Sequence, residues 1–299
     1  MARLRHWLMI ALLGVTLAAA PACQTSPATG RTQLNQLSTS QEIQIGTQAA
    51  PQFLEEYGGP IPSAAVRQYV ADIGHRMADI SERPDLPWEF QVVDSSTINA
   101  FALPGGKIFI SRGLLERMDN EAQLAGVLGH EIGHVTDQHI GQQLTHQMMI
   151  QLGGVGLGII GQQTDNQWLE VLGVGTQVGG TVYLLSFSRR HENVADELGM
   201  RYMTQVGYNP VGQLQMLNIL AEEAARRGPG GIEFLSTHPL PQTRIDRVSQ
   251  IIQSAYPDHD EPGRYRFGRD EYHQNVLARL EQLPPPQHSP EGAAPAPQE

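Results

Sequence analysis

Residues 129–135 read "GHEIGHV", and the interpretation of the whole chain depends on this stretch. His130 and His134 are four residues apart, so on an α-helix both imidazoles leave the same face and can reach one metal ion. Glu131 then lies beside the metal, where a free carboxylate can take a proton from a water molecule. The same residues also fit an ordinary helix surface, so the rest of the chain has to separate the two interpretations.

The composition is that of an acidic globular protein. The 299 residues carry a formal net charge of -11, and 40% of them are hydrophobic, which is enough for a sizeable core. No run of Lys and Arg appears in the body of the chain, so there is no basic patch of the kind that binds nucleic acid. We therefore expect no nucleic-acid partner.

The first residues have the pattern of an export signal. Two arginines precede an apolar run from Trp7 to Ala20, which predicts a signal peptide over residues 1–22. The only cysteine, Cys23, follows directly, and "AAPAC" resembles a bacterial lipoprotein cleavage site. Lipidation of Cys23 would anchor the chain in the periplasm, at the outer membrane. The alternative is ordinary A-x-A cleavage, which would leave a soluble exported protein.

Three further segments stand out by composition. Residues 23–40 are polar and rich in Ser and Thr, which predicts a tether between the anchor and a folded body. Residues 284–299 are rich in Pro and Ala, so we expect a disordered tail in which His288 has no role. Residues 147–187 are rich in Gly, and three interpretations stay open: a tightly packed helical hairpin, a mobile lid, or membrane contact.

Hydrophobic periodicity predicts a mainly helical α+β domain over residues 41–283. Two amphipathic helices are expected at 42–57 and 63–80, followed by β-type runs at 88–94 and 107–111 with a turn at 104–106. The motif helix comes next. Asn120 is its expected N-cap, Gln123 the capping-box partner, and a buried stripe is predicted at Leu124, Val127, Leu128, Ile132 and Val135.

Two histidines hold zinc poorly, so a third protein ligand is expected. The metzincin pattern would need Gly at position 137 and His at position 140, where this chain has Asp137 and Ile140. His139 is one residue short, and helical geometry predicts that it points away from His134. Glu192 is the best candidate, since Asp196 follows four residues later and can receive an N–H from a ligand histidine.

Other interpretations of these positions remain. Glu192 and Asp196 also fit a solvated helix face paired with nearby arginines. His238 precedes a proline and so lies outside regular helix, from where it can stabilise an oxyanion, occupy the open zinc position, or only form hydrogen bonds within a loop. Arg244 fits a surface ion pair or a support for the site.

Four stretches in order resemble the zinc metallopeptidase family of HtpX and the CAAX prenyl endopeptidase, a group of gluzincins: "NAFALPGGKIFIS", "NEAQLAGVLGHEIGHV", "SRRHENVADELG" and "STHPLPQTR". The opening "CQTSPATGRTQL" further resembles the periplasmic lipoprotein branch that includes LoiP and BepA, although no helical-repeat pattern follows residue 283. The resemblance implies a zincin-like domain with one zinc per chain. Its ligands would be His130, His134 and Glu192, with Glu131 as general base, Asp196 as outer partner and His238 near the metal.

The function that follows is a zinc endopeptidase of the bacterial cell envelope, acting on unfolded or misassembled proteins. An edge strand beside the motif helix would bind an extended substrate through its main chain. We assign this role to Lys107, Ile108, Phe109, Ile110 and Ser111. The rivals are a latent or non-catalytic chaperone or assembly factor whose zinc site is closed by His238, and a small-molecule metallohydrolase.

Overall fold

The computed structural model describes residues 23–151, 186–228 and 231–288. The predicted signal peptide and nearly all of the Gly-rich segment lie outside these residues, as do positions 289–299 of the predicted tail. None of the helices within the described ranges has the length and apolar character needed to cross a membrane.

A three-stranded sheet forms one layer of the fold. Its strands are β3 (Glu89–Val93), β4 (Ala100–Leu103) and β5 (Lys107–Ser111), in the order β3-β5-β4. β5 runs parallel to β3 and antiparallel to β4. The β4–β5 hairpin turns at residues 104–106, where Gly105 and Gly106 adopt φ angles of 75° and 90° that favour glycine.

The prediction that residues 107–111 form an edge strand is wrong. β5 is the central strand of the sheet, paired on both sides, and all five of its residues are buried. The strand that the sequence did not predict is β4, which pairs with β5. Its four residues lie in the stretch that was predicted to connect two strands. β4 has a partner strand on one side only among the described residues, so it is the edge beside the motif helix.

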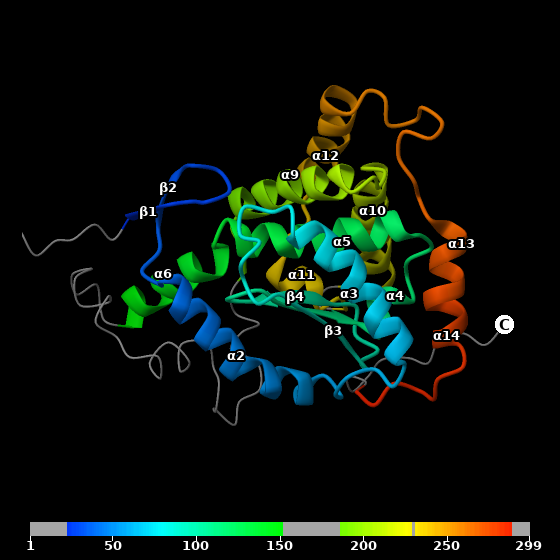
Figure 1. The fold of residues 1–299 in the computed structure, drawn as a ribbon, viewed down its shortest axis with the longest axis horizontal. Helices are drawn as coiled ribbons and strands as arrows, with labels where there is room; N and C mark the ends of the chain where they lie inside the picture. The colour runs from blue at the N-terminus through cyan, green and yellow to red at the C-terminus, as the bar shows by residue number, and fades with distance from the viewer. Residues whose placement is uncertain (1–22, 152–185, 229–230, 289–299) are drawn as a thin grey trace, which may run out of the picture.

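Helices cover both faces of the sheet (Figure 1). α3 (Ala64–Ala78) packs on β3, and α5 (Glu121–Thr136), which carries the motif, packs on β4. α2 (Thr39–Glu56) lies across the other face, where the ring of Phe53 meets that of Phe101 at a centroid distance of 5.7 Å. The predicted pair of amphipathic helices is thus confirmed, within a few residues at each end.

α5 runs through the centre of the core. α9 (Arg189–Gln205) and α10 (Val211–Arg227) pack against it, and all 16 of its residues are buried, where the sequence predicted one buried stripe. Its glycines allow this enclosure: a Cβ on Gly129 would lie 2.9 Å from the carbonyl oxygen of Gly199, so the backbones of α5 and α9 are in contact. The site on α5 is therefore surrounded by protein.

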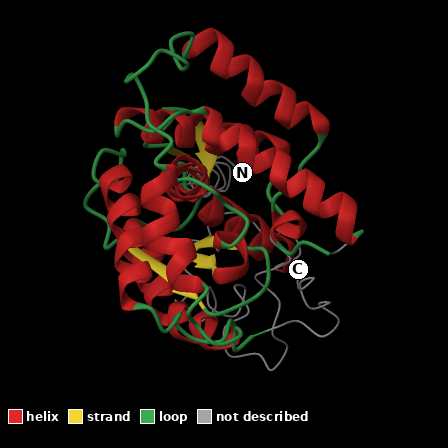
Figure 2. Cartoon of the chain, turned by 90° about the vertical axis from the view of Figure 1, so that its right-hand side faces the viewer, coloured by secondary structure: helices red, strands yellow, loops and turns green. Residues whose placement is uncertain are grey.

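Shorter elements complete the domain, and helices surround the strands in the view turned by 90° (Figure 2). A small second core joins α9 and α10 to the helix over Gln242–Ala255 through Met200, Leu217, Val248 and Ile252. The mainly helical α+β fold is confirmed. The remaining elements are α4 (Arg112–Leu115), α6 (His139–Gln151), α11 (Phe234–Thr237), α12 (Gln242–Ala255), α13 (Arg269–Tyr272), the π-helical turn η2 (His273–Leu277) and α14 (Ala278–Leu280).

The predicted tether is folded. Strands β1 (Cys23–Thr25) and β2 (Thr32–Leu34) form an antiparallel hairpin, and β2 packs against α6. Leu37 is fully buried, and Ser38 caps α2 in a capping box. The polar composition was misleading because these side chains form hydrogen bonds with the body of the protein and not with water alone.

The first residues of the predicted tail are also placed. The backbone N–H of His288 donates to the carbonyl of Asp94 at 3.1 Å, and the N–H of Ser96 donates to the carbonyl of His288 at 2.9 Å. Arg112 donates to the carbonyl of Pro284 at 2.6 Å. The folded domain therefore extends beyond the predicted boundary at residue 284, because backbone hydrogen bonds hold this proline-rich stretch without an apolar pattern.

Candidate metal centre

α5 presents the three motif residues. Asn120 is its N-cap, as predicted, and its side chain accepts from the N–H of Gln123 at 2.9 Å. The side chain of Gln123 accepts from the N–H of Asp119, at 2.8 Å, and not from the capping residue itself. From this start, His130 and His134 fall on the face of α5 that meets α9 and the segment after α11.

α9 presents the two carboxylates that the spacing singled out. Ser188 caps the helix by accepting from the N–H of His191 at 3.2 Å. Glu192 and Asp196 then lie one turn apart, and both are buried. The alternative of a solvated helix face is therefore wrong for these two residues.

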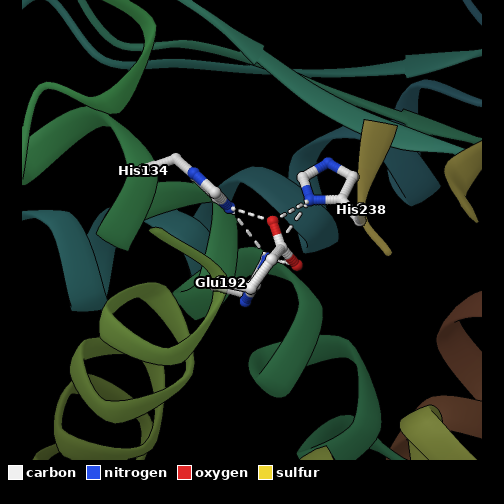
Figure 3. Close-up of side chains that lie close together, drawn as sticks. His134, Glu192 and His238 are labelled. Carbon is white, nitrogen blue, oxygen red and sulfur yellow. Dashed lines mark hydrogen bonds and ion pairs between the residues drawn. The ribbon is translucent and has the colours of Figure 1, made fainter. Parts of the chain in front are cut away.

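Four side chains meet in one buried cluster. His130, His134, Glu192 and His238 each offer a ligand atom, and these atoms lie within 4.8 Å of one another. Figure 3 shows His134 and His238 reaching the carboxylate of Glu192 from two sides. Oε1 of Glu192 lies 3.4 Å from Nε2 of His134 and 3.0 Å from Nδ1 of His238.

The hydrogen bonds fix which nitrogens face the centre of the cluster. Nδ1 of His130 lies 2.9 Å from a carboxylate oxygen of Asp196, so this nitrogen carries the proton and Nε2 is left with a lone pair. Nδ1 of His134 has its own partner, the ring of His139. The two Nε2 atoms are only 3.0 Å apart, a distance at which a shared proton or a bound metal ion must lie between the two lone pairs.

The spacing of these atoms fits a small tetrahedral cation. Metal–ligand bonds of about 2.0–2.2 Å place neighbouring ligand atoms roughly 3.3 Å apart. The close contacts in the cluster include 3.0 Å between the two Nε2 atoms and 3.6 Å between Nε2 of His130 and Oε2 of Glu192, and all four ligand atoms lie within 4.8 Å of one another. Three imidazole nitrogens and a carboxylate oxygen are a donor set typical of zinc sites.

The charges of the cluster favour a bound cation. Burial alone would raise the pKa of Glu192, but the neighbouring charges of His238 and Arg244 hold that pKa well below its ordinary value, so the carboxylate stays ionised. Burial lowers the pKa of His134 well below its ordinary value, so this imidazole stays neutral. An ionised carboxylate and a neutral imidazole are the forms that bind metal.

Glu131 is set apart from the ligands. It is buried, and neither of its carboxylate oxygens has a hydrogen-bond partner within the part of the chain that the structure describes. Burial raises its pKa, although His238 and His130 oppose this, and Nε2 of His238 lies 3.7 Å away. A buried carboxylate without a hydrogen bond is costly, and this distinguishes Glu131 from the hydrogen-bonded Asp196.

Arg244 belongs to the site and not to the surface. Its guanidinium donates to both oxygens of Asp196, at 2.6 Å and 2.8 Å, and forms an ion pair with Glu192. Burial alone would raise the pKa of Asp196, but Arg244 brings it down to about 2. Gln213 also donates to Asp196, at 2.7 Å. The sequence left Arg244 as an open alternative because its partners lie on another helix.

The prediction that His139 points away from His134 is wrong. Its Nδ1 lies 3.0 Å from Nδ1 of His134. α5 ends at Thr136, and Gln138 adopts a left-handed φ of 56°, so His139 does not continue the helical spiral and turns back beside the motif. A break of this kind leaves no clear mark in a single sequence.

Fold and site together define a zincin-like metallopeptidase domain, with two histidines on one helix and a glutamate on the next helix of the core. The sequence profile of peptidase family M48 matches residues 64–252, which include every residue of the cluster. The chain belongs to this family.

Characterised relatives agree with this assignment. The chain is 30% identical over 284 residues to the beta-barrel assembly-enhancing protease of Escherichia coli K12, covering 88% of this chain and 57% of that protein. It is 29% identical over 235 residues to mitochondrial metalloendopeptidase OMA1 of Schizosaccharomyces pombe, covering 77% and 66%. For metalloendopeptidase OMA1 of Danio rerio, the identity is 31% over 245 residues, covering 77% and 50%. The chain thus spans a little over half the length of the bacterial relative.

Proposed function

We propose that this chain is a zinc-dependent endopeptidase of the bacterial cell envelope that acts on unfolded or misassembled proteins. The observation that carries the proposal is the pair of imidazole nitrogens 3.0 Å apart, next to an ionised glutamate and to Glu131, whose carboxylate has no hydrogen bond among the described residues. The relatives named as a beta-barrel assembly-enhancing protease and as metalloendopeptidases support the same reaction.

His130, His134 and Glu192 would hold the zinc. When bound, zinc polarises a peptide carbonyl and makes a water molecule acidic enough to lose a proton near neutral pH. Glu131 would accept that proton. It lies on the motif helix next to the cluster, and among the described residues neither of its carboxylate oxygens has a hydrogen bond. The same carboxylic acid would then deliver the proton to the leaving amine.

An extended substrate would bind along β4, which replaces β5 in this role. β4 packs against α5, and its two central residues, Phe101 and Ala102, are half-buried. Main-chain hydrogen bonds to an edge strand give affinity with little dependence on the substrate's side chains. Such binding suits substrates that expose extended backbone, as unfolded and misassembled proteins do.

His238 supports a resting form in which the site is closed. Its Nδ1 lies 3.4 Å from Nε2 of His130 and 3.0 Å from Glu192, within the ligand cluster itself. A fourth protein ligand would occupy the position that a catalytic zinc keeps for water. The second candidate function is that of a non-catalytic envelope chaperone or assembly factor. In such a protein, His238 would occupy the fourth ligand position permanently.

The envelope location rests on the N-terminus. We propose that Cys23 is lipidated and that the chain is anchored to the outer membrane, facing the periplasm. Metabolic labelling with a radioactive fatty acid tests this: the wild-type chain should incorporate label and Cys23→Ser should not. Equal labelling of both chains would contradict the anchor.

The function is tested with the purified mature chain, its zinc content and its activity on a denatured protein such as reduced casein. We expect about one zinc per chain and cleavage that stops with a chelator and returns with added zinc. Cleavage that continues unchanged in the metal-free protein would contradict the proposal. Zinc binding with no cleavage, in the wild type and in His238→Ala, would favour the non-catalytic candidate.

A further inference from the structure

The two ligand histidines of α5 are supported in different ways. Nδ1 of His130 reaches a carboxylate directly, that of Asp196 at 2.9 Å. Nδ1 of His134 reaches the imidazole of His139 at 3.0 Å instead. A ligand histidine needs a partner on its outer nitrogen to fix its tautomer and ring orientation, so the groups behind His139 matter to the metal.

The hydrogen bonds behind His134 run in one direction. Nδ1–H of His134 donates to Nδ1 of His139, because Nε2 of His134 faces the cluster with its lone pair. His139 must then carry its proton on Nε2, which lies 2.9 Å from Oδ2 of Asp137. The carboxylate of Asp137 therefore sets the tautomers of both imidazoles.

The N-terminal hairpin holds the other oxygen of Asp137. The hydroxyl of Thr29 donates to Oδ1 of Asp137 at 2.9 Å, and the hydroxyl of Ser26 donates to the same atom. Ser26 is buried, and its oxygen also accepts from the N–H of Thr29 at 3.0 Å, which fixes the hydroxyl within the turn of the hairpin. The hairpin thus ends a continuous chain of hydrogen bonds that begins at the metal cluster.

The hairpin also stabilises the bend that brings His139 into place. Gln138 adopts φ 56°, which is unfavourable for a residue with a side chain, so other contacts must hold it. Gln33 of strand β2 donates to Oε1 of Gln138 at 2.8 Å, and Gln138 donates to Glu42 at 3.2 Å. These two hydrogen bonds therefore stabilise the left-handed conformation that turns the chain back after α5.

We propose that Asp137 and His139 are positioning residues for the metal ligand His134, and that the N-terminal hairpin is part of the metal centre through Ser26 and Thr29. The hairpin, which the sequence presented as a tether, then sets how tightly the site holds its metal. This inference rests on the proposed zinc centre. When a ligand histidine loses the hydrogen-bond partner of its outer nitrogen, the metal affinity of the site falls roughly 10–100-fold.

The test is the zinc affinity of the full mature chain, measured by competition with a chromophoric chelator. We expect His139→Phe to weaken zinc binding by roughly 10–100-fold, and Ser26→Ala and Thr29→Val to weaken it by a smaller factor in the same direction. His139→Asn should recover part of the loss, because its amide oxygen can accept from Nδ1–H of His134.

Matched controls separate this role from a merely structural one. Gln24 lies on the same hairpin but donates to Leu37 at 3.2 Å, so Gln24→Ala should leave zinc affinity unchanged. His191 stacks on His139 at a centroid distance of 4.3 Å without joining the hydrogen bonds, so His191→Phe is the control for ring packing. The absorption spectrum of the cobalt-substituted protein should change for His139→Phe and not for either control.

The outcomes are decisive in each direction. If His139→Phe fails to fold, the zinc affinity and the cobalt spectrum of Thr29→Val test the inference instead, because valine keeps the shape of the threonine side chain. The inference would be overturned if His139→Phe bound zinc as tightly as the wild type and kept its cobalt spectrum. If His139→Phe does not fold, the same result for Thr29→Val would overturn it. A wild-type chain that binds no zinc would instead overturn the proposed function.

Discussion

Oε1 of Glu192 lies 3.4 Å from Nε2 of His134, although the two residues belong to different helices. The contact depends on the close packing of α5 and α9, and the ion pair with Arg244 holds the carboxylate on its other side. Glu192 therefore joins the candidate ligand cluster and also pairs with a buried arginine.

Glu192→Ala should remove the metal and destabilise the fold. The variant takes away a proposed ligand and leaves Arg244 with Asp196 as its one ion-pair partner among the described residues, and breaking a buried pair costs about 3–5 kcal/mol. Zinc content and urea unfolding measure the two effects. Glu197→Ala is the control, because Glu197 pairs with Arg247 in the open, with side-chain exposures near 46% and 45%. It should keep its zinc and lose no more than about 1 kcal/mol.

His238→Ala should accelerate cleavage of casein without loss of zinc. The substitution removes the side chain that lies within the ligand cluster, and three ligands remain. Thr237→Ala, on the preceding position of the same turn, should leave the rate as it is. A fall in rate with zinc retained would show instead that His238 stabilises the transition state.

Gly129→Ala should destabilise the protein although alanine favours helix. The new methyl group would lie 2.9 Å from the carbonyl oxygen of Gly199. The two helices are packed against each other, so moving them apart would cost packing energy. Overpacking of this kind costs about 1–3 kcal/mol, against about 1 kcal/mol gained in helix propensity. Urea unfolding should show a net loss. A net gain would mean that α5 and α9 are further apart than described.

Glu233, which is not one of the four residues of the ligand cluster, gives the free energy of unfolding a pH dependence that can be measured. Burial raises the pKa of Glu233 to about 7, against about 4.3 in the unfolded chain. Between these values the folded state binds more protons than the unfolded state, so the free energy of unfolding falls as pH rises through this range.

Glu233→Gln removes this proton, so the variant should lose less stability than the wild type between pH 5 and pH 8. The difference between the two chains should grow by about 2.5 kcal/mol over that range, since one pKa unit is worth about 1.4 kcal/mol. Urea unfolding at both pH values measures it. A difference that does not change with pH would show that Glu233 ionises normally in the folded protein.

Local patterns predicted the parts of the site that lie on single helices. The spacing of His130 and His134, and of Glu192 and Asp196, fixes a shared face as soon as each helix forms. Elimination of the metzincin pattern at Asp137 and Ile140 then directed the search to a second helix. These predictions needed no knowledge of how the helices pack.

The parts that were missed depend on tertiary structure. Arg244 reaches Asp196 from another helix, and His139 reaches His134 only because Gln138 bends the backbone. β4 is four residues long with no clear alternation, so its sequence does not mark it as the edge strand beside β5. The hairpin of β1 and β2 is polar, and its hydrogen bonds to Asp137 and Gln138 cannot be read from composition.

The central claim is that the cluster holds one zinc and that Glu131 moves the proton during peptide cleavage. Glu131→Gln tests it most directly, because glutamine keeps the size of the side chain and cannot act as a base. The variant should bind zinc as the wild type does and cleave reduced casein about 10²–10⁴ times more slowly. Cleavage at the wild-type rate with zinc bound would contradict the account.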